Sequence, residues 1–292
     1  MARQSGYALE KLGEITNLPT LPSTLQEIII NIQDPNIDFR TLKQIIYRDP
    51  PLAARILRIA NSAYFGRRDP TSSLETAFLI LGLNEVIAIV SSIGVVNAFS
   101  HAGSHSFDRR ILWKHSLLTG LTSRYFTRKL EFSSRTDGNE FIAGLLHDIG
   151  HIIINLYFPD EFGAVLEASQ NGANPLEAER ELLGNDHAEL SGYLAERWRF
   201  PSSMTEAMRN HHLSIQPDER PGILNVLRLA DRVCSWREGD EPPITPEQLS
   251  QPEVLANFFP DSTTDQLKSY ANRLTIFPQE FAKIEELSEA ML

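Results

Sequence analysis

The sequence predicts an all-α fold, with a small N-terminal helical bundle packed on a larger helical core and a short C-terminal helical appendage. Apolar residues recur at helical spacing along most of the chain, and runs of β-branched residues at period two are absent. Capping residues and prolines open one segment after another. We expect the bundle over residues 1–100, the core over 101–236, and an acidic linker with C-terminal helices over 237–292.

Local start and stop signals justify the helices of the N-terminal bundle. Ser23 and Gln26 form a capping box, and Asp49 followed by two prolines starts a helix because proline is tolerated in the first turn. Gly82 closes the helix that Ser73 opens. The last segment is apolar on nearly every face, which predicts the central buried helix of this part. The helices expected here cover residues 23–33, 38–47, 49–61, 73–82 and 86–99.

The rest of the chain continues the helical pattern. A loop containing Gly, Ser and His at 101–106 marks the boundary between the two parts, and the acidic, proline-rich segment 238–246 favours a linker. The helices expected in the core cover residues 108–130, 139–157, 160–170, 174–183, 187–198, 202–212 and 221–236. Two more are expected in the tail, over 262–274 and 278–291.

Composition indicates an ordinary soluble globular protein. The chain has 292 residues, of which 42% are hydrophobic and 22% charged, enough for a sizeable core. The N-terminus lacks the apolar stretch of a signal peptide, and the nearly apolar segment 86–99 is too short to span a bilayer. The single cysteine, Cys234, excludes an intramolecular disulfide. We therefore expect a cytoplasmic protein that does not associate with membranes.

The charge of the chain is acidic and uneven. The net charge is −11, and the tail over 237–292 contributes most of it. Such a charge argues against broad nucleic-acid binding through phosphate contacts. A basic strip of Arg124, Arg128 and Lys129 lies at helical spacing, and we interpret it as a solvated helix face rather than a binding patch.

Histidines gather in the predicted core. Six of the eight lie between His115 and His212, and an adjacent His147-Asp148 pair stands in the segment GLLHDIGH, where we expect it on one helical turn. Imidazole nitrogens with two carboxylates suit a divalent transition metal such as Fe, Mn or Zn. The candidate metal ligands are His115, His147, Asp148, His187, His211, His212 and Asp231.

Other readings of these residues stay open at this point. Asp148 and Asp231 lie in apolar runs, and a buried carboxylate needs a partner, which a metal, an arginine or a backbone cap could supply. His187 follows Asp186 and equally fits a helix-capping turn. The pair at 211–212 could simply end a helix, where imidazolium favours the dipole.

Longer motifs carry a resemblance to a known family. The first part contains LPTLPST at 18–24, RDPPLAARILRIANSAYFG at 48–66 and SLETAFLILGLNEV at 73–86. The second contains GLLHDIGH at 144–151, ERELLGNDHAELSGYLAERWRFP at 179–201 and AMRNHH at 207–212. Over about residues 15–236 the chain resembles the HDOD family of bacterial regulatory proteins. This resemblance implies a helical N-terminal bundle packed on an HD-type helical core.

The resemblance also implies how the ligands divide between two ions. As in HD phosphohydrolases, one ion would take His115, His147, Asp148 and Asp231, and Asp148 would bridge to a second ion completed by His187, His211 and His212. This second set resembles the HD-GYP cyclic-di-GMP phosphodiesterases. However, their lysine after His-Asp-x-Gly is His151 here, their Gly-Tyr-Pro signature is missing, and Ile111 stands where some members have an acid. Metal binding therefore survives the comparison better than cyclic-di-GMP hydrolysis does.

Two functions follow as hypotheses. In the first, the chain is a signal-transduction protein that keeps its metal site and acts through contacts with another signalling protein or a second copy of itself. In the second, it is a metal-dependent phosphohydrolase or phosphodiesterase acting on a nucleotide or another phosphoester. Asp148 and His151 would then be catalytic, with His151 facing the substrate where the related enzymes place lysine. We favour the regulatory hypothesis because simple HD hydrolases have no use for the N-terminal bundle.

Overall fold

A computed structural model of the chain is helical throughout the residues that it describes, and no strand occurs among them, which confirms the all-α prediction. The described residues are 4–15, 18, 20, 43, 46–62, 65, 69–99, 108–132, 139–213, 222–235 and 243–292. The predicted helix over 23–33, most of the one over 38–47 and the boundary loop at 101–106 lie outside them. The division into a bundle, a core and an appendage stays a prediction.

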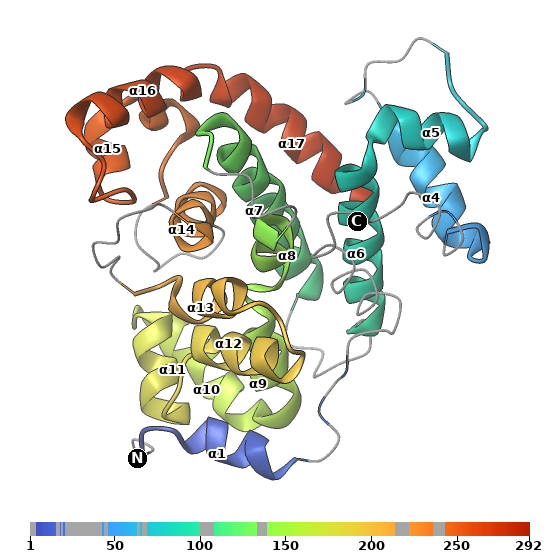
Figure 1. Cartoon of the computed structure of the whole chain (residues 1–292). Coiled ribbons are helices and arrows are strands. Elements are labelled where there is room, and N and C mark those ends of the chain that lie inside the picture. Colours follow the sequence, from blue (N-terminus) through green and yellow to red (C-terminus); the bar gives the residue numbers. More distant parts are fainter. Residues whose placement is uncertain are drawn as a thin grey trace.

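The helices of the N-terminal part begin and end largely where their capping residues predict. They are α1 (Tyr7–Glu14), α4 (Pro50–Ala60), α5 (Leu74–Leu81) and α6 (Leu83–Ala98). Asp49 caps α4 by accepting a hydrogen bond from the backbone N–H of Leu52, and Ser73 caps α5. Gly82 ends α5 with a φ of 74°, a conformation that favours glycine. The sequence did not predict α1, which packs against α12 of the core rather than against α4–α6 (Figure 1).

The core is built around one long helix. Its helices are α7 (Arg109–Lys129), α8 (Asn139–Leu146), α9 (Ile149–Tyr157), α10 (Pro159–Gln170), α11 (Pro175–Leu183), α12 (His187–Arg197), α13 (Ser202–Asn210) and α14 (Ile223–Cys234). Helix α7 packs against α8 and α14, while α12 packs against α9 and α13 (Figure 1). Side chains buried between these helices form one continuous hydrophobic core.

The C-terminal helices return to both parts of the chain. They are a short 3-10 helix, η2 (Pro246–Ser250), and α15 (Pro252–Ala256), α16 (Thr264–Leu274) and α17 (Phe277–Met291). The last helix, red in Figure 1, packs along α7 and then reaches α4 and α6. Arg55 Nη2 on α4 donates a hydrogen bond of 2.7 Å to the carbonyl of Met291. The appendage therefore joins the N-terminal helices to the core.

One predicted helix is broken. The continuous helix expected over 139–157 is wrong, because His147 and Asp148 form a turn between α8 and α9. The imidazole Nδ1 of His147 bonds back to the carbonyl of Gly144 at 2.8 Å, and the N–H of His151 bonds to the carbonyl of Asp148 at 3.0 Å. The His-Asp pair thus sits at a helix junction rather than on one continuous helical turn.

The interpretation of Arg124 as part of a solvated face is also wrong. Arg124 is buried, and its Nη2 donates a 2.7 Å hydrogen bond to Oε1 of Glu85, which is buried as well. This ion pair joins α7 to α6. Arg128 is exposed, as predicted.

The described helices also bear on the prediction that the protein does not associate with membranes. No single described helix has both the length and the apolar composition to cross a membrane. Two sharply bent helix pairs, Leu74–Leu81 with Glu85–Ala98 and Asn139–Tyr157 with Pro159–Gln170, meet those two criteria when each pair is taken together.

Candidate metal centre

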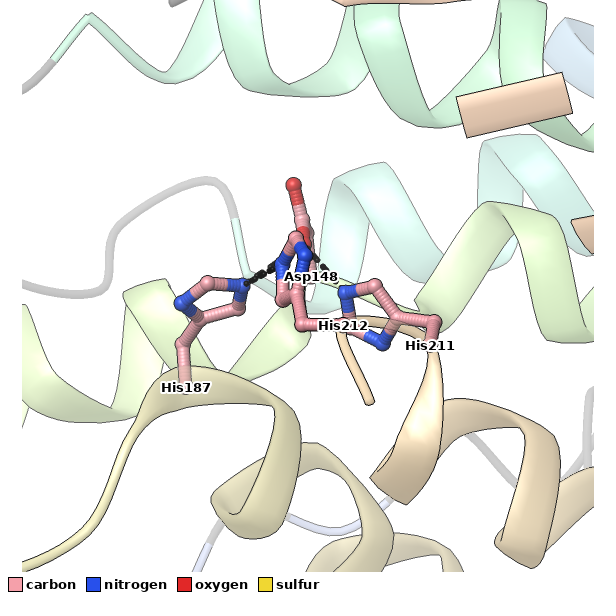
Figure 2. A group of neighbouring side chains, drawn as sticks. All are labelled: Asp148, His187, His211 and His212. Carbon is pink, nitrogen blue, oxygen red and sulfur yellow. Dashed lines mark hydrogen bonds and ion pairs between the residues drawn. The ribbon is translucent and has the colours of Figure 1, made fainter. Parts of the chain in front are cut away.

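The core brings all seven predicted ligands to one place. His115 comes from α7, His147 and Asp148 from the junction between α8 and α9, and His187 from the first residue of α12. His211 and His212 follow the last residue of α13, and Asp231 lies on α14. Figure 2 shows the rings of His187 and His211 turned toward Asp148 from two sides. Five segments far apart in the sequence therefore meet at Asp148.

The first group of side chains surrounds the carboxylate of Asp231. The Nε2 atom of His115 lies 3.1 Å from Asp231 Oδ1, and Nε2 of His147 lies 3.4 Å from the same oxygen. The two Nε2 atoms are 3.1 Å apart. Asp148 closes the group, with Oδ1 at 3.4 Å from His147 Nε2 and Oδ2 at 3.5 Å from His115 Nε2.

The second group shares Asp148 with the first. Oδ1 of Asp148 lies 3.3 Å from Nε2 of His187 and 3.5 Å from Nε2 of His211. Nε2 of His212 lies 2.9 Å from Nε2 of His187. One potential ligand atom from each of Asp148, His187, His211 and His212 falls within 4.8 Å of the others.

Backbone carbonyls and one carboxylate determine which imidazole nitrogen carries the proton. Nδ1 of His115 faces the carbonyl of Cys234 at 2.9 Å, and Nδ1 of His147 faces that of Gly144. Nδ1 of His211 likewise faces the carbonyl of Met208, and Nδ1 of His187 faces a carboxylate. Because these oxygens only accept hydrogen bonds, each Nδ1 donates its proton. In the neutral rings, the lone pair therefore lies on Nε2, the nitrogen that points into the centre.

This arrangement fits bound cations. Without one, the lone pairs of His115 and His147 would face each other at 3.1 Å, and Nε2 of His211 is buried with no hydrogen bond among the described residues. Ligands held at about 2.0–2.2 Å around one ion lie roughly 2.8–3.6 Å from each other, by the geometry of a tetrahedron or octahedron. The separations of 2.9–3.5 Å found here match that range.

The electrostatics of the centre divide the imidazoles into two kinds. Although burial opposes their charge, Asp148 and Asp231 raise the pKa of His147, and Glu179 and Asp148 raise the pKa of His187 well above its ordinary value, so an ion would displace a proton from each of these two rings. Burial opposes the charge of Asp148, but the positive charge of His147 and the nearby Nε2 atoms of His187 and His211 hold its pKa well below the ordinary value. Burial lowers the pKa of His211, and burial together with the neighbouring charges of His211 and His187 lowers the pKa of His212 well below its ordinary value. Asp148 is thus a carboxylate, while His211 and His212 are neutral imidazoles.

A buried glutamate that the sequence analysis missed supports this centre. Glu179 on α11 is fully buried, and its Oε2 accepts hydrogen bonds from Nδ1 of His187 at 2.7 Å and from the backbone N–H of His187 at 2.8 Å. Burial opposes its charge, but His187 and His151 hold the pKa of Glu179 well below the ordinary value. An acid on the apolar face of a short helix, in register with Ala178 and Leu183, was the signal that could have revealed it.

His151 lies behind the predicted metal ligands. Its ring is buried and stacks on the ring of His187 with centroids 3.9 Å apart, and its Nδ1 lies 3.3 Å from Oε1 of Glu179. The structure thus turns this side chain toward α11. Its predicted contact with a substrate stays a prediction.

The alternative interpretation of His187, as part of a helix-capping turn, is correct, and its role as a metal ligand stays a prediction. Asp186 is the N-cap of α12 and forms a capping box with Glu189. The same cap presents the side chain of His187 to Asp148, so one local structure provides both the cap and the position of this predicted ligand.

Comparison with known proteins identifies the family. A family model described as the HDOD domain matches residues 18–214. The chain belongs to the HDOD domain family. An HDOD domain protein of unknown function from Geobacter sulfurreducens has the same fold, with a TM-score of 0.78 and 25% identity over 96% of this chain and 97% of its own.

Two further proteins are similar over most of this chain. A structure from Shewanella amazonensis SB2B, titled "Putative phosphohydrolase", matches with a TM-score of 0.72 and 22% identity over 99% of both chains, a level that shows the fold. An uncharacterized protein of Treponema pallidum (strain Nichols) is 26% identical over 89% of this chain. The match covers 49% of that protein, so this HDOD chain spans about half the length of the curated relative.

Proposed function

We propose that this HDOD chain is a regulatory protein of signal transduction that binds two divalent transition-metal ions, Fe, Mn or Zn, and acts through protein contacts. The observation that carries the proposal is the convergence of imidazole Nε2 atoms on the buried carboxylate of Asp148 and the half-buried carboxylate of Asp231. One ion would be held by His115, His147, Asp148 and Asp231. The other would be held by Asp148, His187, His211 and His212.

The packing of the C-terminal helix supports action through protein contacts. Helix α17 lies along α7, the helix that positions His115, and also contacts α4 and α6 of the N-terminal part. The buried ion pair between Glu85 and Arg124 joins α6 to α7 a second time. A partner that binds the N-terminal helices would therefore contact a part of the chain whose helices pack against α17 and are joined to α7, and α7 carries His115. The partner is another signalling protein or a second copy of this chain.

Metal content of purified protein tests the proposal. Protein prepared without chelators should contain about two ions per chain, and the variant His147→Ala/Asp148→Ala should lose both because Asp148 is shared. The double change also removes the buried carboxylate, so it leaves no stranded charge and the protein should keep its helical circular dichroism spectrum. Asp160→Ala, which removes an exposed carboxylate from α10, is the matched control and should keep both ions.

Two results would contradict this function. A double variant that keeps its full metal complement would show that other residues bind the ions. Wild-type protein that takes up no Fe, Mn or Zn would show that the chain has no metal centre.

A second candidate function is a metal-dependent phosphohydrolase, and one observation favours it. A cavity of about 160 Å³ borders the centre and is lined in part by His211, His212 and Asp231. When bound, a pair of cations supplies Lewis-acid charge to a phosphate. Asp231 and His212, which line this cavity, would hold the two ions beside the phosphate, with Asp148 shared between the ions. Metal-dependent turnover in a screen of phosphoesters, abolished in the double variant, would establish this activity.

Hydrolysis of cyclic-di-GMP is expected to be slow even if other phosphoesters are substrates. The lysine and the Gly-Tyr-Pro segment of the HD-GYP enzymes are missing from the sequence, and positioning accounts for much of a catalysed rate. Rapid, metal-dependent hydrolysis of cyclic-di-GMP would contradict that expectation and favour the enzyme over the regulatory protein.

A further inference from the structure

The cavity beside the metal centre carries two arginines. Arg228 and Arg232 lie one turn apart on α14, on either side of Asp231, and both line the cavity together with Asn174 and His212. Residues four apart on a helix share a face, so the two guanidinium groups are neighbours. Sequence analysis singled out Asp231 on this helix and missed the arginines that flank it.

Arg228 has a buried hydrogen-bond donor that an anion could satisfy. Its Nη1 atom is buried and makes no hydrogen bond among the residues that the structure describes. Burial and the adjacent charge of Arg232 lower the pKa of Arg228, although a guanidinium stays protonated in proteins. A buried charged donor without an acceptor is costly, and a ligand oxygen would satisfy it.

The residues that line the cavity carry a net positive charge, whereas the chain as a whole is negative. The protein has a net charge of −11, yet this cavity presents two guanidinium groups. Two divalent ions would outweigh the carboxylates of Asp148 and Asp231, so the loaded centre adds further positive charge. An anion is the complement of such a lining, and Arg forks match the oxygens of a phosphate.

The size and composition of the cavity restrict that anion. Its volume of about 160 Å³ is well below the roughly 300–1,000 Å³ of pockets that enclose drug-sized ligands. Apart from the two imidazoles of His211 and His212, no described residue of the lining is aromatic, so none offers a large ring on which a nucleobase could stack. The cavity suits a compact ligand and not a dinucleotide.

We propose that Arg228 and Arg232 form a binding site for one phosphate group, either inorganic phosphate or the phosphate of a small monoester, beside the metal centre. This inference rests on the proposed function, because the ions complete the positive lining. The arginines are binding residues, and the class of ligand is a single phosphate in either of the two functions above.

Calorimetric titration of the full, metal-loaded chain tests the inference. Inorganic phosphate, glycerol phosphate and cyclic-di-GMP are titrated separately, and the metal content of each sample is measured before and after. Phosphate or the monoester should bind, and the one that binds more tightly identifies the source of the group. Arg228→Gln should weaken binding by about 10- to 100-fold, the loss expected for charge-assisted hydrogen bonds. Arg232→Gln should also weaken it.

Two further variants make the result specific. Arg228→Lys keeps the charge without the fork and should bind with intermediate affinity. Arg128→Gln removes an exposed arginine from α7, makes the same change in net charge, and should bind like the wild type.

The outcomes separate this inference from the proposed function. A chain that keeps its ions but binds neither phosphate nor the monoester, or binds them equally well in Arg228→Gln, overturns the inference alone. Tighter binding of cyclic-di-GMP than of both small ligands overturns it as well. If the wild type holds no ions, the proposed function fails. Titration of the same metal-free protein with phosphate then tests the arginine site by itself. Phosphate binding that Arg228→Gln weakens supports the site, and the absence of binding overturns it.

Discussion

Gly150 on α9 provides a sharp test of how the second group of ligands is placed. A Cβ atom added at this residue would lie 2.0 Å from the carbonyl oxygen of His187, whereas real Cβ atoms essentially never approach another atom within 3.0 Å. The N–H of Gly150 also donates to Oγ of Ser191, which in turn donates to the His187 carbonyl. In Gly150→Ala, α9 and α12 must therefore separate by about 1 Å.

The expected magnitude follows from that contact. Overpacking a core costs about 1–3 kcal/mol, and the upper end applies because the obstacle is backbone rather than a flexible side chain. Alanine recovers about 1 kcal/mol through its higher helix propensity. The variant should unfold with a free energy about 2 kcal/mol lower than the wild type. Because metal sites tolerate errors of about 0.2 Å, the displaced His187 should also weaken binding of the second ion.

Gly163→Ala is the matched control. Gly163 lies exposed on α10, and an added Cβ would meet no atom within 4 Å. This variant should be stabilised by about 0.5–1 kcal/mol and should keep both ions. Urea denaturation followed by circular dichroism measures the two free energies, and elemental analysis measures the ions. Equal stability and equal metal content in the two variants would refute the reasoning.

Two further predictions concern buried groups near the centre. Glu179→Gln should lower the affinity for the second ion by about 10- to 100-fold, because the neutral amide no longer holds the His187 ring with a full charge. The control Glu177→Gln, at an exposed residue of the same helix, should have no effect. Unchanged affinity in a metal titration of Glu179→Gln would show that Glu179 does not support the site. Burial raises the pKa of Cys234 to about 12, above its ordinary 9.0, so the folded thiol stays protonated where the unfolded one ionises and the native state loses stability as the pH rises above 9. A thiol reagent at pH 8 should label Cys234 only after denaturation, and rapid labelling of native protein would contradict this burial.

Much of the fold could be predicted from local signals in the sequence. Asp49 and Ser73 cap helices in the structure as their residue types and spacing predict, and Gly82 ends one. A capping residue acts on backbone groups within one helical turn of itself, so the residues that cause the helix to start or end are also the pattern visible in the sequence. The short η2 and α15 escaped prediction because five residues are too few to show a helical period. Helix α1 escaped it because Gly6, at its N-cap, has no side chain that marks the start of a helix. Packing against other helices stabilises all three.

The candidate ligands could be chosen from residue type and order, but their arrangement in space could not. The sequence placed His147 and Asp148 on a continuous helix, whereas the structure breaks the helix there so that Asp148 can contact both groups. It left His187 open between a cap and a ligand, and the structure makes it the first residue of a capped helix that also faces Asp148.

The sequence by itself determined the all-α class, the capped helix ends at Asp49, Ser73 and Gly82, and the candidate ligands, because each depends on neighbouring residues and on side-chain chemistry. Only the tertiary structure decided the roles of Glu179, Arg124 and the two arginines on α14. An acid or an arginine looks the same in sequence whether water or protein surrounds it. Packing of distant helices buries Glu179 against His187, pairs Arg124 with Glu85 in the interior and places Arg228 at the wall of a cavity. A buried charge needs a partner, so burial makes each of these interactions specific.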